Sequence, residues 1–169
     1  NYLAIFRRLF LIDDQEAFSS NMRSPVRLKQ AAKRHLVDPS LAVALLGATE
    51  KSLIGDLQTL GFLFEALCER DLRIYAESFG AKLYHYQDYA NHEIDAVIEL
   101  EGGDWAAFEI KLGAHEIDAA AFNLIKIRDK ILEAKGQAPR VLAVICGLTN
   151  AAYLRSDGVY VLPITALKA

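Results

Sequence analysis

Apolar and polar positions alternate in two neighbouring stretches near the middle of the chain. Residues 92–100 and 105–111 are rich in β-branched and aromatic side chains, and a Glu-Gly-Gly-Asp turn separates them. Alternation over such short runs is typical of strands, and a short glycine-containing connection is typical of a hairpin. We therefore predict a β-hairpin, in which alternation places Asp95 on the same face as Val97.

Apolar residues recur at helical spacing in four other stretches. Residues 2–12 combine a short amphipathic helix with the start of a strand. Residues 39–46 predict a helix that has a proline in its first turn and a glycine just past its end. Residues 52–71 carry a wide apolar stripe, which predicts a long helix interrupted or kinked near Gly61. Residues 116–135 predict a second long helix.

The remaining segments predict strands and turns. We expect strands at 35–38, 72–79, 82–87, 140–147 and 159–163, a turn at 13–16, a short polar helix or loop at 149–155 and a helical turn at 164–168. The order of elements after residue 49 predicts an α/β fold, with an antiparallel meander followed by parallel strands joined through a crossover helix. We divide the chain into residues 1–48 and 49–169.

Composition narrows the class of protein. The chain is 53% hydrophobic and 24% charged with a net charge of −3, which is typical of a soluble globular protein and not of a general nucleic-acid coating protein. No apolar run reaches the roughly 18–20 residues that span a bilayer, and we recognise no signal-peptide pattern in these residues. Cys68 and Cys146 lie in apolar runs without metal-type spacing, so we expect buried thiols, no zinc site and a cytoplasmic location.

Residues 19–34 form a basic segment. It contains Arg23, Arg27, Lys29, Lys33 and Arg34. Such a segment usually belongs to a solvated face, and phosphate contact or docking to a partner domain is the alternative. The chain begins in the middle of a helical pattern without an initiator methionine, so we also expect a fragment of a longer protein.

The hairpin supplies the candidate chemistry. If it turns about Gly102, Asp95 and Glu109 lie opposite one another with Cβ atoms about 4.5–5.5 Å apart, and Lys111 follows on the same side. Two facing carboxylates repel unless a positive charge lies between them, and Lys111 or a divalent metal ion can provide it. The alternative is an ordinary cross-strand pair worth at most about 1 kcal/mol. Apolar neighbours of Glu109 indicate a central strand, where an uncompensated charge is costly.

These residues also carry a family resemblance. Asp95, followed across the hairpin by Glu109-Ile110-Lys111, resembles the motif of the PD-(D/E)XK nuclease superfamily, although Ile94 stands where proline often precedes the first acid. Glu65 on the long helix resembles the acidic residue of that superfamily's first core helix. More narrowly, the chain is similar to a domain of unknown function found at the C-terminus of bacterial and archaeal AAA-type ATPases. The similar segments are 2–12, 20–24, 36–42, 61–65, 93–95 and 109–111.

The resemblance implies a restriction-endonuclease-like core, with a central mixed sheet flanked by helices over 49–169, preceded by a small winged-helix-like remnant in 1–48. It implies cleavage of DNA that depends on Mg²⁺ or Mn²⁺. Asp95, Glu109 and Glu65 would be the metal ligands, the Ile110 carbonyl a further one, and Lys111 would polarise the attacking water. ATP would bind only in a missing N-terminal ATPase module, because this sequence contains no P-loop.

Three alternatives stay open. The domain can be a catalytically inactive module that binds nucleic acid or protein, and Glu65 can pair with Arg70 or Lys111 instead of a metal. The histidines and tyrosines near the hairpin are interpreted by default as surface and packing residues, with phosphate contact by His92 and base stacking by the tyrosines as lesser options. They are His85, His92, His115, Tyr84, Tyr86 and Tyr89.

Overall fold

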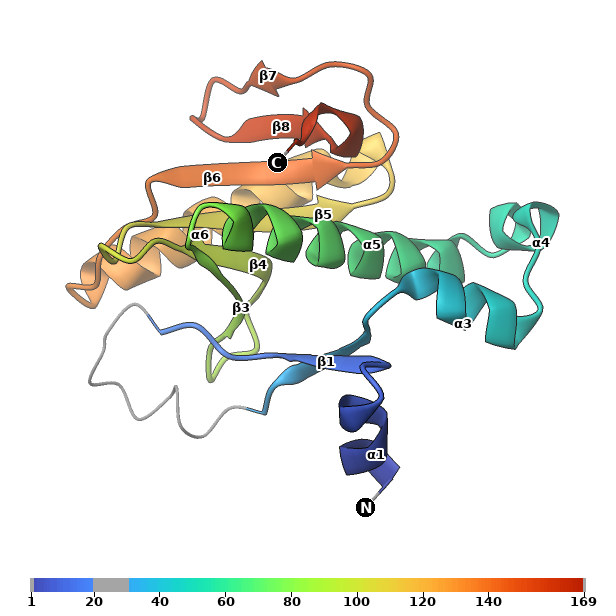
Figure 1. Ribbon diagram of the computed structural model, residues 1–169. Helices are drawn as coiled ribbons and strands as arrows, with labels where there is room; N and C mark the ends of the chain where they lie inside the picture. Colours follow the sequence, from blue (N-terminus) through green and yellow to red (C-terminus); the bar gives the residue numbers. More distant parts are fainter. Residues whose placement is uncertain (1, 20–30, 169) are drawn as a thin grey trace.

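The computed structural model describes residues 2–19 and 31–168 (Figure 1). In chain order the elements are α1 (Tyr2–Arg8), β1 (Ile12–Gln15), β2 (Lys33–Leu36), α3 (Pro39–Leu46), α4 (Glu50–Gly55), α5 (Leu57–Ser78), β3 (Lys82–Gln87), β4 (Glu93–Glu99), β5 (Trp105–Lys111), the 3₁₀ turn η1 (Ala114–Glu116), α6 (Ile117–Glu133), β6 (Val141–Cys146), β7 (Tyr153–Leu154), β8 (Tyr160–Pro163) and the 3₁₀ turn η2 (Ile164–Ala166).

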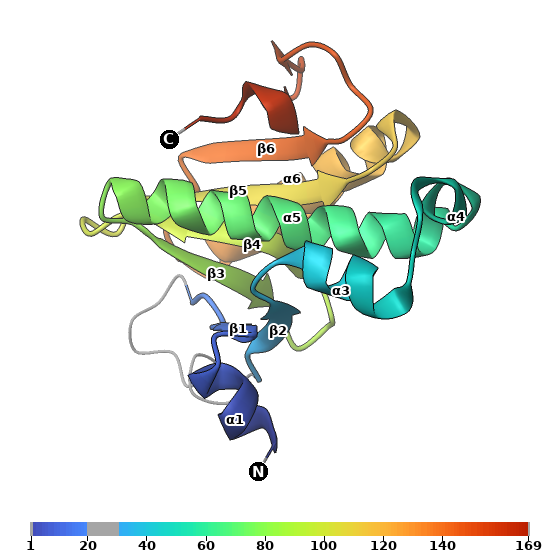
Figure 2. The same ribbon diagram turned by 45° about the vertical axis from the view of Figure 1, so that its right-hand side comes forward.

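A six-stranded mixed sheet forms the centre of the molecule, with strand order β3-β4-β5-β6-β8-β7. Strands β3, β4 and β5 are antiparallel, β5, β6 and β8 are parallel, and the short β7 runs antiparallel to β8. Helix α5 covers one face of this sheet and α6 the other (Figures 1 and 2). The expected mixed α/β architecture, with a crossover helix between β5 and β6, is confirmed.

Each face of the sheet has its own apolar core. On the α5 side, Cys68 and Leu72 pack with Phe108 and Ile145. On the α6 side, the core includes residues of β4, β5, β6 and β8, together with Phe18 from the N-terminal segment. Cys68 and Cys146 are both fully buried free thiols, as predicted. The central strands contribute side chains to both cores, so both cores depend on the same sheet.

The long helix differs from its prediction in two ways. The break lies at Asp56, which caps α5 by accepting a hydrogen bond from the Thr59 amide at 3.1 Å, and α5 then passes through Gly61 without interruption. The strand predicted at 72–79 is wrong, because α5 continues to Ser78. The reason is that the buried positions Cys68, Leu72 and Ala76 are spaced four apart, which extends the helical stripe.

Two further local predictions are wrong. The expected turn at 13–16 is largely strand β1, which pairs antiparallel with β2 because Asp13 and Asp14 meet basic side chains of β2 and neighbouring helices. The expected polar helix or loop at 149–155 contains the short strand β7. The helix at 39–46 and its glycine stop are confirmed, and Gly47 adopts a φ of +59°.

The basic segment is only partly described. Arg23, Arg27 and Lys29 lie outside the described residues, whereas Lys33 and Arg34 lie on β2 and form ion pairs. Just before the basic segment, Phe18 packs onto the main sheet, where its ring centroid lies 4.7 Å from that of Trp105. None of the described helices is both long and apolar enough to cross a membrane.

Candidate active site

The hairpin of β4 and β5 forms as predicted. Its ladder places Glu99 opposite Trp105 and Ala96 opposite Phe108, and Gly103 in the connection adopts a φ of +83°. The ladder ends at the Ala96–Phe108 pair, so Asp95 and Glu109 are the next residues along each strand. The two acids therefore lie where β4 and β5 stop pairing.

A β-bulge determines how Asp95 is presented. Tyr84 of β3 pairs with Val97 and Tyr86 pairs with Ile94, so three steps along β4 oppose two along β3. Ile94 and Val97 consequently pack in the same core, which breaks the alternation expected from the sequence. A bulge of this kind redirects a side chain and ends regular pairing. Asp95 lies in the bulge, and its Oδ2 accepts a hydrogen bond from the amide of Ile110 at 2.8 Å.

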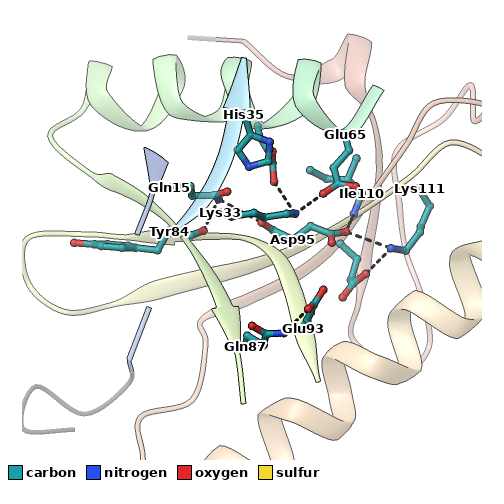
Figure 3. Close-up of polar contacts among 12 residues, drawn as sticks. Gln15, Lys33, His35, Glu65, Tyr84, Gln87, Glu93, Asp95, Ile110 and Lys111 are labelled. Atoms are coloured by element: carbon teal, nitrogen blue, oxygen red, sulfur yellow. Dashed lines mark hydrogen bonds and ion pairs between the residues drawn. The ribbon is translucent and has the colours of Figure 1, made fainter. Parts of the chain in front are cut away.

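Lys111 lies between the two carboxylates. Its Nζ is 2.8 Å from Glu109 Oε2 and 3.2 Å from Asp95 Oδ2. Burial lowers the pKa of Lys111, but the charges of Asp95 and Glu109 together raise it by more. The net shift of this pKa is therefore upward. The predicted residues Asp95, Glu109 and Lys111 are thus brought together as one ionic cluster, of which Figure 3 labels Asp95 and Lys111.

Glu109 is the most enclosed member of this cluster, with only 4% of its surface exposed. Its Oε1 accepts a hydrogen bond from Asn123 Nδ2 of α6 at 2.9 Å. Burial, with the Asp95 charge second, raises the pKa of Glu109 to about 7, although Lys111 and Asn123 act in the opposite direction. Burial is thus the larger cause of the upward pKa shift, and the charge of Asp95 adds to it.

Glu65 lies near the same site but on α5, and it has a partner that the sequence did not predict. Lys33 of β2 forms an ion pair with Glu65, and its Nζ lies 3.2 Å from Glu69 Oε1 (Figure 3). Neither Arg70 nor Lys111 pairs with Glu65 among the described contacts; Arg70 instead contacts Asp71 at 2.8 Å. Burial raises the pKa of Glu65, while Lys33 lowers it and Asp95 raises it.

The N-terminal segment also contacts the site through the buried side chain of Gln15. Gln15 Nε2 donates to the carbonyl of Tyr84 at 2.8 Å and to the carbonyl of Asp95 at 3.3 Å. These are carbonyls beside the bulge. On the other side of Lys33, His35 Nδ1 lies 2.8 Å from Glu69 Oε2. Strands β1 and β2 therefore both contribute to the surroundings of Asp95 and Glu65.

The carboxylates at the site are the type of donor that a hard divalent cation takes. Four carboxylates (Glu65, Glu69, Asp95 and Glu109) face two ammonium groups, those of Lys33 and Lys111. Oxygen donors with residual negative charge suit Mg²⁺ or Mn²⁺, and Mg²⁺ needs only one or two carboxylates because it keeps several waters. Within residues 2–19 and 31–168, no three His, Cys, Asp or Glu side chains form a group that could hold a metal ion.

A cleft gives access to the cluster. It has a volume of about 780 Å³ and lies between the first turns of α5 and the end of β5, where Glu65 and Lys111 are among its lining residues. Phe62, His115 and Leu148 also line it. A smaller cavity on the other side of β4 is lined by Lys33 and Asp95. The site can therefore be approached from solvent on the Lys111 side.

The sequence missed four neighbours of the cluster, which are Gln15, Lys33, Glu69 and Asn123. Two of them carried a signal. Glu69 follows Glu65 by one helical turn and so lies on the same face of α5. Asn123 is a polar residue one position before the buried Leu124, within the apolar stripe of α6. Lys33 and Gln15 gave no signal, because a sequence does not show which distant segment lies against a strand.

The histidines differ from the expectation of surface residues at one position. His85 is buried, and burial, with Lys33 second, lowers its pKa. His92 is partly buried and its Nδ1 lies 2.9 Å from Asp88 Oδ2. His115 lines the cleft beside Lys111.

Two family models match the chain, one over its larger C-terminal part and one over its N-terminal part. Residues 60–167 match the family described as Domain of unknown function (DUF4143), which covers more than half of the chain. The chain belongs to the DUF4143 family. The DUF4143 match includes most of α5, the hairpin and the crossover, and hence Glu65, Asp95, Glu109 and Lys111.

The N-terminal segment matches separately. Residues 1–52 match a second family, Domain of unknown function (DUF8612), so Gln15 and Lys33 come from outside the DUF4143 match. No curated protein and no solved structure gives a significant match to the chain.

Proposed function

We propose that this chain is a metal-dependent phosphodiesterase, a nuclease domain of the PD-(D/E)XK type that acts on DNA. The observation that carries the proposal is the convergence of Asp95, Glu109 and Lys111 at the point where β4 and β5 part, beside an open cleft. The same proposal includes two further points. The core has a restriction-endonuclease-like fold, and the domain works with an AAA-type ATPase module on the same polypeptide.

The roles follow from the contacts. Asp95 and Glu109 would hold Mg²⁺ or Mn²⁺, with Glu65 adjacent on α5. When bound, such an ion lowers the pKa of a coordinated water and offsets charge on the phosphate. Lys111 orients the attacking water and stabilises the negative charge that develops on the phosphate oxygens. The Ile110 amide and Asn123 hold the two carboxylates in place, so little reorganisation is needed.

A second candidate function is a catalytically inactive module that binds nucleic acid or a protein partner. One observation favours it: the carboxylates already pair with Lys33 and Lys111, and the described residues contain no three-ligand metal group. In that case the ion pairs would serve the fold alone.

Cleavage of end-labelled DNA in Mg²⁺ or Mn²⁺ tests the first proposal. We expect Asp95→Asn and Lys111→Met to reduce the cleavage rate by roughly 100-fold or more, because each removes a group that acts on the reacting phosphate. Asp104→Asn is the matched control, since Asp104 is an acid at the opposite end of the same hairpin, paired with Arg140. Unchanged cleavage by either site variant would contradict the assignment.

Thermal melting separates the two candidates. A metal that binds only the folded protein stabilises it by about 2.7 kcal/mol at a concentration of 100 Kd. The nuclease proposal predicts a higher melting temperature in Mn²⁺, and a smaller rise for Asp95→Asn. No shift, together with intact DNA and DNA binding that weakens steeply with salt, would favour the inactive module.

A further inference from the structure

The side chain of Lys33 places a positive charge beside Glu65 of α5. It projects from β2, outside the DUF4143 match, and its ammonium group contacts both Glu65 and Glu69 (Figure 3). These two glutamates are one helical turn apart and therefore face Lys33 together. The side chains of Lys33 and Glu65 are both partly buried, with 33% and 24% of their surface exposed. Enclosure of this kind limits screening of the pair by water.

A divalent ion and an ammonium group compete for the same carboxylate oxygens. A metal bound by Asp95 and Glu109 that also recruits Glu65 would compete with Lys33 for the negative charge of that carboxylate. Asp95 contributes to the same balance, since its charge acts on both Lys33 and Glu65. Lys33 and a bound metal ion would therefore compete for the same carboxylates.

We propose that Lys33 is a tethered competitor of the metal ion: its ammonium occupies the cation position beside Glu65, and withdrawal of Lys33 opens that position. The inference rests on the proposed function. It makes the N-terminal segment a regulator of the site, since displacement of β2 changes the metal affinity of residues on α5 and β4. Lys33 would thus be a site residue supplied by the segment that matches the second family.

The way β2 is held fits such a role. Within the described residues, β2 pairs only with β1, and these two strands form a sheet separate from the central one. Strand β1 is anchored more firmly, through Gln15 and through backbone hydrogen bonds of Glu16 and Phe18 to His85 at 3.0 and 2.6 Å. Side-chain contacts such as Lys33 with Glu69 and His35 with Glu69 connect β2 to α5. Among the described residues, no strand pairing joins β2 to the main sheet, so withdrawal of Lys33 need not break the pairing of that sheet.

Binding of Mn²⁺, followed by electron paramagnetic resonance of the free ion, tests this inference. We expect Lys33→Met to bind Mn²⁺ roughly tenfold more tightly than the wild type, a change within the usual range for coupled sites. Lys33→Arg keeps the positive charge and should retain the wild-type affinity. Lys51→Met, on the exposed surface of α4, is the control for loss of a lysine elsewhere.

The outcomes separate the inference from the proposed function. Equal or weaker Mn²⁺ binding by Lys33→Met, while the wild type binds, would show that Lys33 is a structural ion-pair partner and would overturn the inference alone. Absence of Mn²⁺ binding at millimolar concentration in both proteins would overturn the metal site and the inference together. If Lys33→Met does not fold, Lys33→Gln serves as the second variant and is judged by the same affinities.

Discussion

At the residue scale, Glu109 is a buried carboxylic acid within the ionic cluster, with 4% of its surface exposed. Its carboxyl group is buried between Asn123 and Lys111, and burial together with Asp95 raises its pKa to about 7 from an ordinary value of 4.5. The folded state therefore binds a proton more tightly than the unfolded state does. Stability that depends on this proton is fully present below pH 4.5 and is lost as the pH rises through 7.

This linkage gives a pH prediction. In metal-free buffer, the free energy of unfolding of the wild type should fall relative to that of Glu109→Gln by up to about 3 kcal/mol between pH 4.5 and 7. Glutamine cannot titrate, so the variant lacks this contribution. Urea denaturation at a series of pH values measures the difference. Parallel pH profiles for the two proteins would show that Glu109 ionises as it does in water.

At the scale of elements, α5 is the clearest difference between sequence and structure. The run Leu-Arg-Ile-Tyr at 72–75 is rich in strand-forming residues, but Leu72 and Ala76 continue the stripe that Cys68 begins. Tertiary packing overrides local propensity here. The hairpin, in contrast, was predictable because its alternation and its turn agree. The bulge at Asp95 was not, since it arises from pairing with β3 and not from β4 itself.

Two substitutions test the helical assignment. Leu72→Ala should lower the free energy of unfolding by about 2–5 kcal/mol, because Leu72 is buried under α5. Ile74→Ala should change it by less than about 0.5 kcal/mol, since Ile74 is 53% exposed. In a strand, residues 72 and 74 would share a face, so equal losses in urea denaturation would contradict the helix.

At the scale of the whole molecule, the two faces of one sheet form two cores that cannot separate. Cys68 lies in the core under α5 and Cys146 in the core under α6, and both are fully buried. Burial raises the pKa of the Cys68 thiol, which further suppresses its reactivity. The sequence predicted this overall architecture from its order of elements. It did not predict how β1 and β2 contact the site, because that depends on contacts between distant segments.

The shared sheet predicts a single cooperative unit. Pulse labelling with a thiol reagent across a urea series, read by mass spectrometry, should show Cys68 and Cys146 becoming reactive at the same urea concentration. Exposure of either core disrupts the strands that the other core needs. Labelling of Cys68 at clearly lower urea than Cys146 would show instead that α5 detaches as a separate unit.

The most direct test of the central claim is the origin of the oxygen in a cleaved phosphate. A DNA substrate is incubated with the protein and Mg²⁺ or Mn²⁺ in ¹⁸O-labelled water, and the products are analysed by mass spectrometry. We predict metal-dependent fragments whose terminal phosphate carries one ¹⁸O atom, and loss of these fragments with Lys111→Met. Intact DNA under conditions in which the wild type binds the metal, or the same products from Lys111→Met, would contradict the assignment of Asp95, Glu109 and Lys111 as a hydrolytic site.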